Sequence, residues 1–144
     1  MISISIMLKS LSEKLGAREN MRAVFINAPA DLIKIINTDK LDLKKTIAGR
    51  FDYIHFFAND QKEFRKTFPG LKKHLKETGM VWVSWPKSGQ NETDLSITKV
   101  IEIGYQYGLV ESKCISLNKV WSALKFTWPK KGKTYNNSYG KLNS

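Results

Sequence analysis

The residue types best suited to bind a ligand lie in three polar loops, each of which follows an apolar run. These loops are Asn27-Ala28-Pro29, Ala58-Asn59-Asp60 and Trp85-Pro86-Lys87-Ser88. An apolar run without alternation is typical of a strand buried on both faces of a sheet, so we expect the loops at strand ends. In an open parallel sheet, ligands bind beyond the carboxyl ends of the strands, where such loops face one another.

The third loop carries groups that together suit an anion. Lys87 supplies a charge, Ser88 and Thr93 supply hydroxyls, and a helix that begins near Thr93 would add free N–H groups. The alternative is that this segment only caps the helix and that the lysine is solvated. Two indole rings near strand ends either line the same crevice or serve packing. We expect a crevice for a small anionic ligand, formed by Asn27, Trp85, Lys87, Ser88, Thr93 and Trp121.

Positive charge is densest in the middle of the chain. The sequence has 24 Lys and Arg against 13 Asp and Glu, a net charge of +11. Lysines on an exposed helix contact phosphates without reading bases. One hypothesis is therefore weak, sequence-insensitive nucleic-acid binding through Lys72, Lys73 and Lys76. The alternative is a lysine-rich solvated surface, because no base-reading motif accompanies the charge.

Other chemistry has little support in the residue pattern. His55 lies within an apolar strand and is expected to be a hydrogen-bonded core residue. Cys114 lies on a strand with alternating pattern and is expected to be a buried thiol. One cysteine and two histidines do not furnish a standard zinc site, so no metal is expected. The lone cysteine and the absence of a membrane-length apolar stretch favour a cytoplasmic protein without a membrane partner.

The elements that position these residues follow from hydrophobic periodicity. Buried strands are predicted at 22–27, 51–58 and 80–85, and helices between them imply parallel pairing through right-handed crossovers. The middle helix is amphipathic with a basic outer face, and we expect it to bend at Pro69 and end at Gly79. Two alternating strands, 109–117 and 120–128, form a tight antiparallel hairpin.

The predicted fold class is α/β, a three-layer sandwich whose mostly parallel sheet ends in a C-terminal antiparallel hairpin. Residues 1–128 are expected to form a single domain. Residues 129–144 are rich in Lys, Gly, Asn and Ser without periodicity, and we expect a flexible basic tail there.

Three long runs carry a more specific resemblance. They are LSEKLGARENMRAVFINAP at 11–29, VWVSWPKSGQNETDL at 81–95 and YGLVESKCISLNKVWSALKF at 107–126. In order and spacing they resemble a bacterial family known only as domain of unknown function 3052. Members often have a second basic residue after the Pro-Lys pair and a glycine where this chain has Ala123. The resemblance implies a fold similar to a truncated class I methyltransferase and no established activity.

A methyltransferase requires a cofactor site, and this part of the sequence departs from the usual pattern. Such sites have a glycine-rich turn after the first strand and usually an acid after the second. Here the turn reads Asn27-Ala28-Pro29-Ala30-Asp31, and no acid follows segment 41–47 before Asp52. We therefore expect a binding module without catalysis and without a cofactor, with a divergent S-adenosylmethionine-dependent methyltransferase as the enzyme alternative. The sequence does not determine the oligomeric state.

Overall fold

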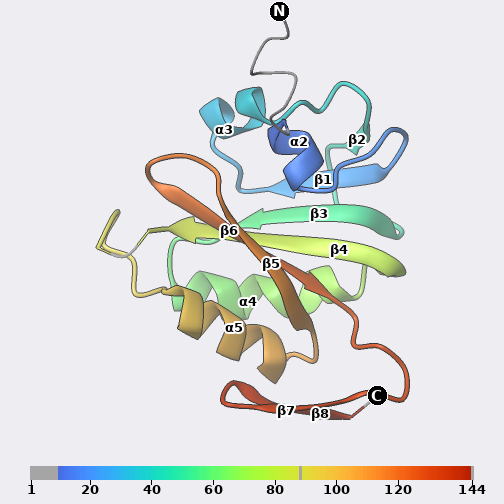
Figure 1. The fold of residues 1–144 in the computed structure, drawn as a ribbon. Coiled ribbons are helices and arrows are strands. Elements are labelled where there is room, and N and C mark those ends of the chain that lie inside the picture. Colours follow the sequence, from blue (N-terminus) through green and yellow to red (C-terminus); the bar gives the residue numbers. More distant parts are fainter. Residues whose placement is uncertain (1–9, 88, 144) are drawn as a thin grey trace, which may run out of the picture.

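A six-stranded sheet forms the centre of the computed structural model, which describes residues 10–87 and 89–143 (Figure 1). The strand order is β2-β1-β3-β4-β6-β5. The first four strands in this order pair in parallel, and β6 pairs antiparallel with β4 and β5. Their bounds are Arg22–Ile26 for β1, Asp42–Lys44 for β2, Phe51–Phe57 for β3, Leu75–Pro86 for β4, Val110–Ser116 for β5 and Trp121–Thr127 for β6. This arrangement confirms the predicted mostly parallel sheet with a C-terminal antiparallel hairpin.

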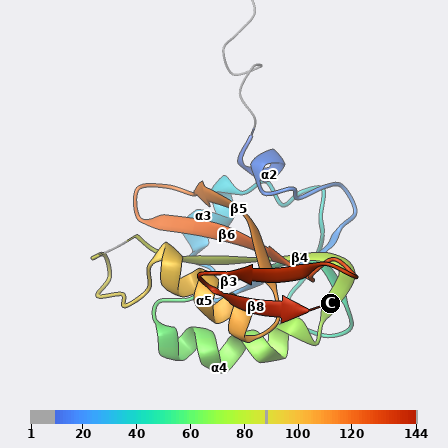
Figure 2. The ribbon, with the colours of Figure 1, turned by 60° about the horizontal axis from the view of Figure 1, so that its bottom comes forward.

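Helices cover both faces of the sheet, as the three-layer prediction requires. On one face lie the short helices α2 (Leu11–Lys14) and α3 (Ala30–Ile35), and on the other lie α4 (Gln61–Lys72) and α5 (Ile97–Gln106) (Figure 2). Successive side chains of a strand point to opposite faces, so β3 contributes to two separate cores. Ile54 packs with α4 and α5, whereas Tyr53 packs with α2 and α3. Apolar side chains on both faces explain why the strand reads as a continuous hydrophobic run.

Helix α4 is shorter than its periodicity predicts. It ends at Lys72, and Leu75 already begins β4 by pairing with Phe51, so the predicted stop at Gly79 is wrong. A Cβ atom on Gly79 would lie 2.7 Å from the carbonyl oxygen of Phe51, which shows that the glycine serves close strand approach. The helix runs through Pro69 as one element. Proline has no N–H to donate to the carbonyl four residues earlier, so one backbone hydrogen bond of the helix is missing there. The bend at Pro69 stays a prediction.

Helix α5 begins later than predicted. Its N-cap is Ser96, whose hydroxyl accepts a hydrogen bond from the Lys99 amide at 3.3 Å, so the predicted start near Thr93 is wrong. Ser96 competes with several other cap-type residues in this loop, and only the tertiary position of the helix selects among them. The C-terminal stop at Gly108 is confirmed by its φ of 84°.

The last segment forms a second small sheet instead of a tail without secondary structure. Strands β7 (Thr134–Asn137) and β8 (Gly140–Asn143) pair as an antiparallel hairpin that lies beside α5 (Figure 2). The side-chain amide of Asn137 donates to the Tyr105 hydroxyl at 3.0 Å, and Leu142 packs against the core. The prediction of a tail is therefore wrong over 134–143, because contacts with α5 stabilise strands that show no periodicity of their own.

Candidate functional site

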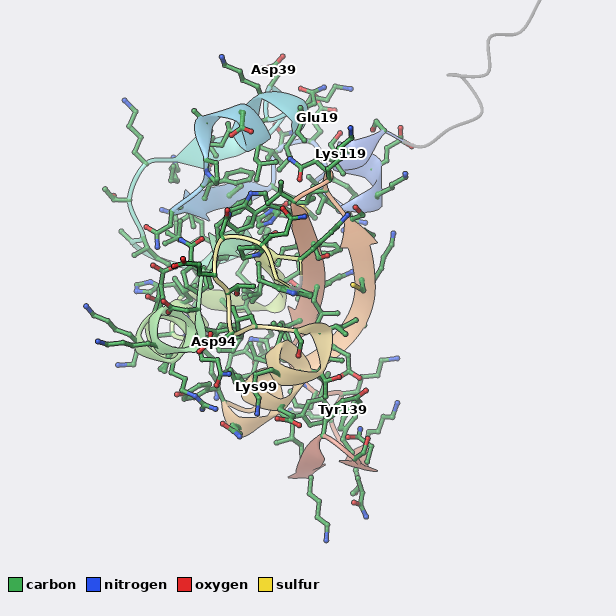
Figure 3. All side chains as sticks on the ribbon, turned by 90° about the vertical axis from the view of Figure 1, so that its left-hand side faces the viewer. Glu19, Asp39, Asp94, Lys99, Lys119 and Tyr139 are labelled. Atoms are coloured by element: carbon green, nitrogen blue, oxygen red, sulfur yellow. The ribbon has the colours of Figure 1, made fainter. Side chains whose placement is uncertain are left out.

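The carboxyl edge of the sheet contains the point where the strand order reverses. From β1 the chain crosses to β2 on one side and then returns to β3 on the other, which places a topological switch point between β1 and β3. The arrowheads of these strands point to the left in Figure 1, so Figure 3 looks onto this edge. A cavity of about 380 Å³ lies there, and we call it the switch-point cavity. It is lined by Asn27, Asp60, Lys62, Glu63, Lys66 and Thr67.

The turn after β1 has a left-handed backbone at its first residue. Asn27 has a φ of 58°, and its side chain is exposed at the cavity. Asparagine is one of the few residues other than glycine that adopt this conformation readily. The chain therefore makes its sharp turn after β1 without a glycine. Pro29 still removes one amide donor from the same loop.

Two carboxylates of the cavity also cap helix α4. Asp60 Oδ1 accepts a hydrogen bond from the Glu63 amide at 2.8 Å, and Glu63 Oε1 accepts one from the Asn59 amide at 3.0 Å. Acids at this end also interact favourably with the helix dipole. A carboxylate accepts hydrogen bonds through both oxygens, so each keeps acceptor capacity for a ligand. Lys62 and Lys66 are exposed, and neither forms an ion pair with any residue that the structure describes.

The loop that precedes α5 is fastened to the same edge. Thr93 Oγ1 donates to the carbonyl oxygen of Asn59 at 2.6 Å. Asp94, labelled in Figure 3, accepts a hydrogen bond from the Gln61 amide at 2.8 Å through Oδ1. These bonds connect the loop after β3 to the loop after β4. The hydroxyl of Thr93 thus stabilises the loop and does not lie at a helix start.

The structure does not bring the two predicted crevice tryptophans together. Trp85 is only 3% exposed and packs in the core beneath α4 and α5. Trp121 is half-buried on the opposite face, where its ring lies 5.4 Å from that of Phe57 in an edge-on arrangement. Asn27 lines the switch-point cavity, and Ser88 lies outside the described residues.

Lys87 is held near the β5–β6 hairpin. Its Nζ donates to Ser116 Oγ at 2.8 Å, and its side chain is half-buried. A lysine ammonium has three donors, so two remain for an anion. Binding of a small anionic ligand by Lys87 stays a prediction.

We expect inorganic phosphate to raise the melting temperature of the protein and Lys87→Ala to abolish most of that rise. The reason is that a charge-assisted hydrogen bond contributes about 1.5–3 kcal/mol. At ten times its Kd the anion would stabilise the fold by about 1.4 kcal/mol, or roughly 5 °C. Thermal unfolding with and without phosphate measures this. Lys119→Ala is the matched control, since Lys119 is an exposed lysine on the neighbouring turn. An equal phosphate effect in both variants would remove Lys87 from any anion site.

The three lysines considered for nucleic acid do not share one helix face. Lys72 lies in the last turn of α4 and Lys73 is its C-cap, but Lys76 belongs to β4. Lys76 also forms an ion pair with Asp52 at 3.1 Å. The prediction that Lys76 lies on the helix is therefore wrong, because the helix ends before it.

His55 is confirmed as a hydrogen-bonded core residue. It is fully buried, its Nδ1 lies 2.9 Å from the Tyr53 hydroxyl and its Nε2 lies 2.6 Å from Ser84 Oγ. Burial lowers the pKa of the imidazole to about 3. Cys114, in contrast, is exposed, so the prediction of a buried thiol is wrong. It lies on β5, the strand at one edge of the sheet, in a run of exposed residues.

The described part of the chain shows neither a cluster of metal ligands nor a membrane-spanning helix. Within 10–87 and 89–143, no group of three or more potential metal ligands gathers at one place. No helix in the same ranges is long and apolar enough to cross a bilayer.

Several solved structures with similar architecture are methyltransferases. The ribosomal protein L11 methylase of Lactobacillus delbrueckii subsp. bulgaricus aligns with a TM-score of 0.57 at 15% identity, covering 83% of this chain and 76% of that chain. The precorrin-6y C5,15-methyltransferase of Geobacter metallireducens GS-15 gives 0.54 at 10% identity, covering 81% and 84%. A SAM-dependent methyltransferase of Aquifex aeolicus gives 0.54 at 12% identity, covering 79% and 85%. The chain has a class I methyltransferase fold.

Sequence comparisons do not assign the chain to a protein family. No protein-family model matches the chain, so the resemblance to domain of unknown function 3052 is not confirmed, and no curated protein matches it. At identities this low, structural likeness concerns the fold alone.

Most residues that line the switch-point cavity were not predicted from the sequence as site residues. Asn27 and the loop after β3 were singled out, but the side chains of α4 were assigned to a solvated basic face. The available signal was their spacing, since Lys66 and Thr67 follow Glu63 by three and four residues and therefore share one helix face with it. That face begins directly after the loop at Asp60, which places it at the carboxyl edge.

Proposed function

We propose that this chain is a divergent S-adenosylmethionine-dependent methyltransferase that binds its cofactor in the switch-point cavity. The observation that carries the proposal is the position of a polar cavity at the strand-order reversal of a class I methyltransferase fold. Ligands of open α/β sheets bind at this point. The methyltransferase neighbours support this enzyme alternative over the binding module without catalysis that the sequence favoured.

The charges of the cavity fit the methionine part of the cofactor. That part carries an ammonium and a carboxylate, and the lining supplies both complementary signs. Asp60 and Glu63 would accept hydrogen bonds from the ammonium, and Lys62 and Lys66 would hold the carboxylate. The left-handed turn at Asn27 brings the end of β1 to the same place. When bound, the cofactor supplies an electrophilic methyl group on a sulfonium.

The adenosine part fits less well. The lining of the cavity holds no aromatic or large aliphatic side chain to cover a purine ring. The acid on β2 is Asp42, which is the first residue of the strand, is exposed and pairs with Lys44 at 3.1 Å. With half of the cofactor poorly covered, we expect a Kd of roughly 100 μM, or about −5.5 kcal/mol.

Calorimetric titration with S-adenosylmethionine and with its demethylated product tests this. The double substitution Lys62→Gln and Lys66→Gln removes both cations and is expected to weaken binding at least tenfold, because two charge-assisted contacts are lost. The matched control is Lys72→Gln with Lys73→Gln, which makes the same charge change at the other end of α4. Equal affinities in the two double variants, or no heat with millimolar cofactor, would refute the site.

The turn at Asn27 gives a second test of the same site. Asn27→Gly keeps the left-handed conformation and removes only the amide, so the melting temperature should stay close to that of the wild type. Asn27→Val places a β-branched residue at a φ of 58°, which strains the turn by about 1–3 kcal/mol. We expect cofactor affinity to fall in the valine variant and to be largely kept in the glycine variant. The reverse order would show that the amide, not the turn, governs binding.

A further inference from the structure

A second cavity lies at the opposite edge of the sheet, where the parallel strands begin. Its volume is about 510 Å³, and it is formed by the C-terminal ends of α4 and α5 together with the end of β6 and β8. We call it the Trp128 cavity. Its lining is mostly apolar or aromatic, apart from two lysines and a glutamine: Pro69, Lys72, Lys73, Gln106, Tyr107, Gly108, Trp128 and Leu142. Neither the fold class nor the switch-point cavity accounts for it.

Trp128 lines this cavity and also a second one. The second has a volume of about 420 Å³ and is lined by Glu77, Thr78, Trp128, Pro129 and Lys131. The indole is half-buried, and its Nε1 donates to the Leu75 carbonyl at 3.4 Å. A half-buried ring that borders two cavities presents aromatic surface to a ligand from a fixed position.

Cations flank the indole in both cavities. Lys72 Nζ lies over one face of the Trp128 ring, 5.3 Å from its centre, and donates to the Tyr107 carbonyl. The exposed Lys73 adds a second charge in the Trp128 cavity, and Lys131 adds one in the neighbouring cavity. Among the residues that the structure describes, Lys72 and Lys73 form no ion pair. Glu77 is the one acid in the two linings.

We propose that Trp128 stacks with a base of a single-stranded nucleic acid on the ring face that Lys72 does not cover, while Lys72 and Lys73 hold a phosphate on one side and Lys131 holds one on the other. An aromatic platform between cations is the usual arrangement for binding a single strand without sequence selectivity. A lipid or other ligand with one anionic head would need cations on one side only. The inference is independent of the proposed methyltransferase activity, since it uses the other edge of the sheet.

The test is fluorescence anisotropy with a labelled ten-nucleotide uridine strand at two salt concentrations. Trp128→Leu should weaken binding by roughly tenfold, and Trp128→Tyr should keep most of the affinity because a ring remains. Replacing Lys72 and Lys73 by Gln should flatten the dependence of log affinity on log salt by about 0.7, the value for one phosphate contact on a single strand. The double variant of Lys62 and Lys66 is the control and should bind as the wild type does.

Three results would overturn the proposal. If the Lys62 and Lys66 variant loses as much affinity as the Lys72 and Lys73 variant, net charge alone explains the binding. If a duplex of the same length binds as tightly as the single strand, base stacking on Trp128 is refuted. If uridine monophosphate binds as tightly as the strand, the site holds a free nucleotide. Melting temperatures accompany each measurement, and if Trp128→Leu does not fold, Trp128→Tyr and the lysine variants decide.

Discussion

Lowering the pH from 7 to 5 is expected to reduce the free energy of unfolding by about 2 kcal/mol through His55 alone. The folded-state pKa of this imidazole is about 3, against 6.5 as its ordinary value. Below pH 6.5 the unfolded chain therefore binds a proton that the folded protein excludes, so stability is full above that pH. It falls as the pH drops, and by pH 3 the loss reaches roughly 4 kcal/mol.

The cause is the surroundings of the ring. His55 lies between Tyr53 and Ser84, and its ring stacks on Phe57 with centroids 4.5 Å apart. A neutral imidazole donates through one nitrogen and accepts through the other, so both hydroxyls are satisfied without a charge. A protonated ring would place an uncompensated charge in a fully buried site.

Urea unfolding at several pH values, with two variants, checks this prediction. His55→Gln keeps hydrogen-bonding capacity without a titrating group and should lose the pH dependence between 7 and 5. Ser84→Ala retains the buried imidazole, so it should be less stable at every pH while keeping the wild-type slope. If His55→Gln and the wild type show the same slope, the histidine is not the group responsible.

Gly104→Ala is expected to destabilise the protein by about 3 kcal/mol or more. A Cβ atom at this position of α5 would lie only 2.0 Å from Cε1 of Phe126 on β6. Phe126 is fully buried and packs against Phe68 at a ring distance of 5.7 Å, so it has little room to move. Relief would require α5 to shift away from the sheet, with loss of contacts along its buried face.

Gly70→Ala is the matched control for this substitution. Gly70 also lies within a helix, but an added Cβ atom meets no heavy atom within 4 Å. Alanine should therefore stabilise α4 by about 0.5–1 kcal/mol through helix propensity. Thermal or urea unfolding of both variants gives the comparison. Adding Phe126→Leu to Gly104→Ala should recover part of the loss, and strict additivity of the two changes would contradict the proposed clash.

Sequence periodicity predicted the central strands because strands buried on both faces have an almost wholly apolar composition. β3 and the central part of β4 are apolar at nearly every position, which is what burial on both faces demands. Helix ends were predicted less well. The apolar spacing of α4 continues to Leu75, yet that residue pairs with Phe51 in the sheet. A leucine satisfies a helix face and a buried strand equally, so the choice depends on a partner distant in sequence.

The sequence also located some residues of the candidate sites and missed others. Loops after buried strands located Asn27 and Asp60 at the carboxyl edge, because parallel strands end together. The sequence could not show that Trp85 and Trp121 lie on opposite faces of the sheet, since their faces depend on registers set by β6. It also could not reveal the Trp128 cavity, whose lining comes from four elements.

By itself, then, the sequence determined the class of fold, the buried strands, the C-terminal hairpin and the hydrogen-bonded core role of His55, all of which rest on local composition and alternation. Tertiary structure alone decided the order of the strands, the left-handed turn at Asn27, the end of α4 and the hairpin at 134–143. The physical reason is that hydrophobic periodicity reports how much of a segment is buried. Which partner buries it is set by long-range packing and pairing, and cavities form only where those partners meet.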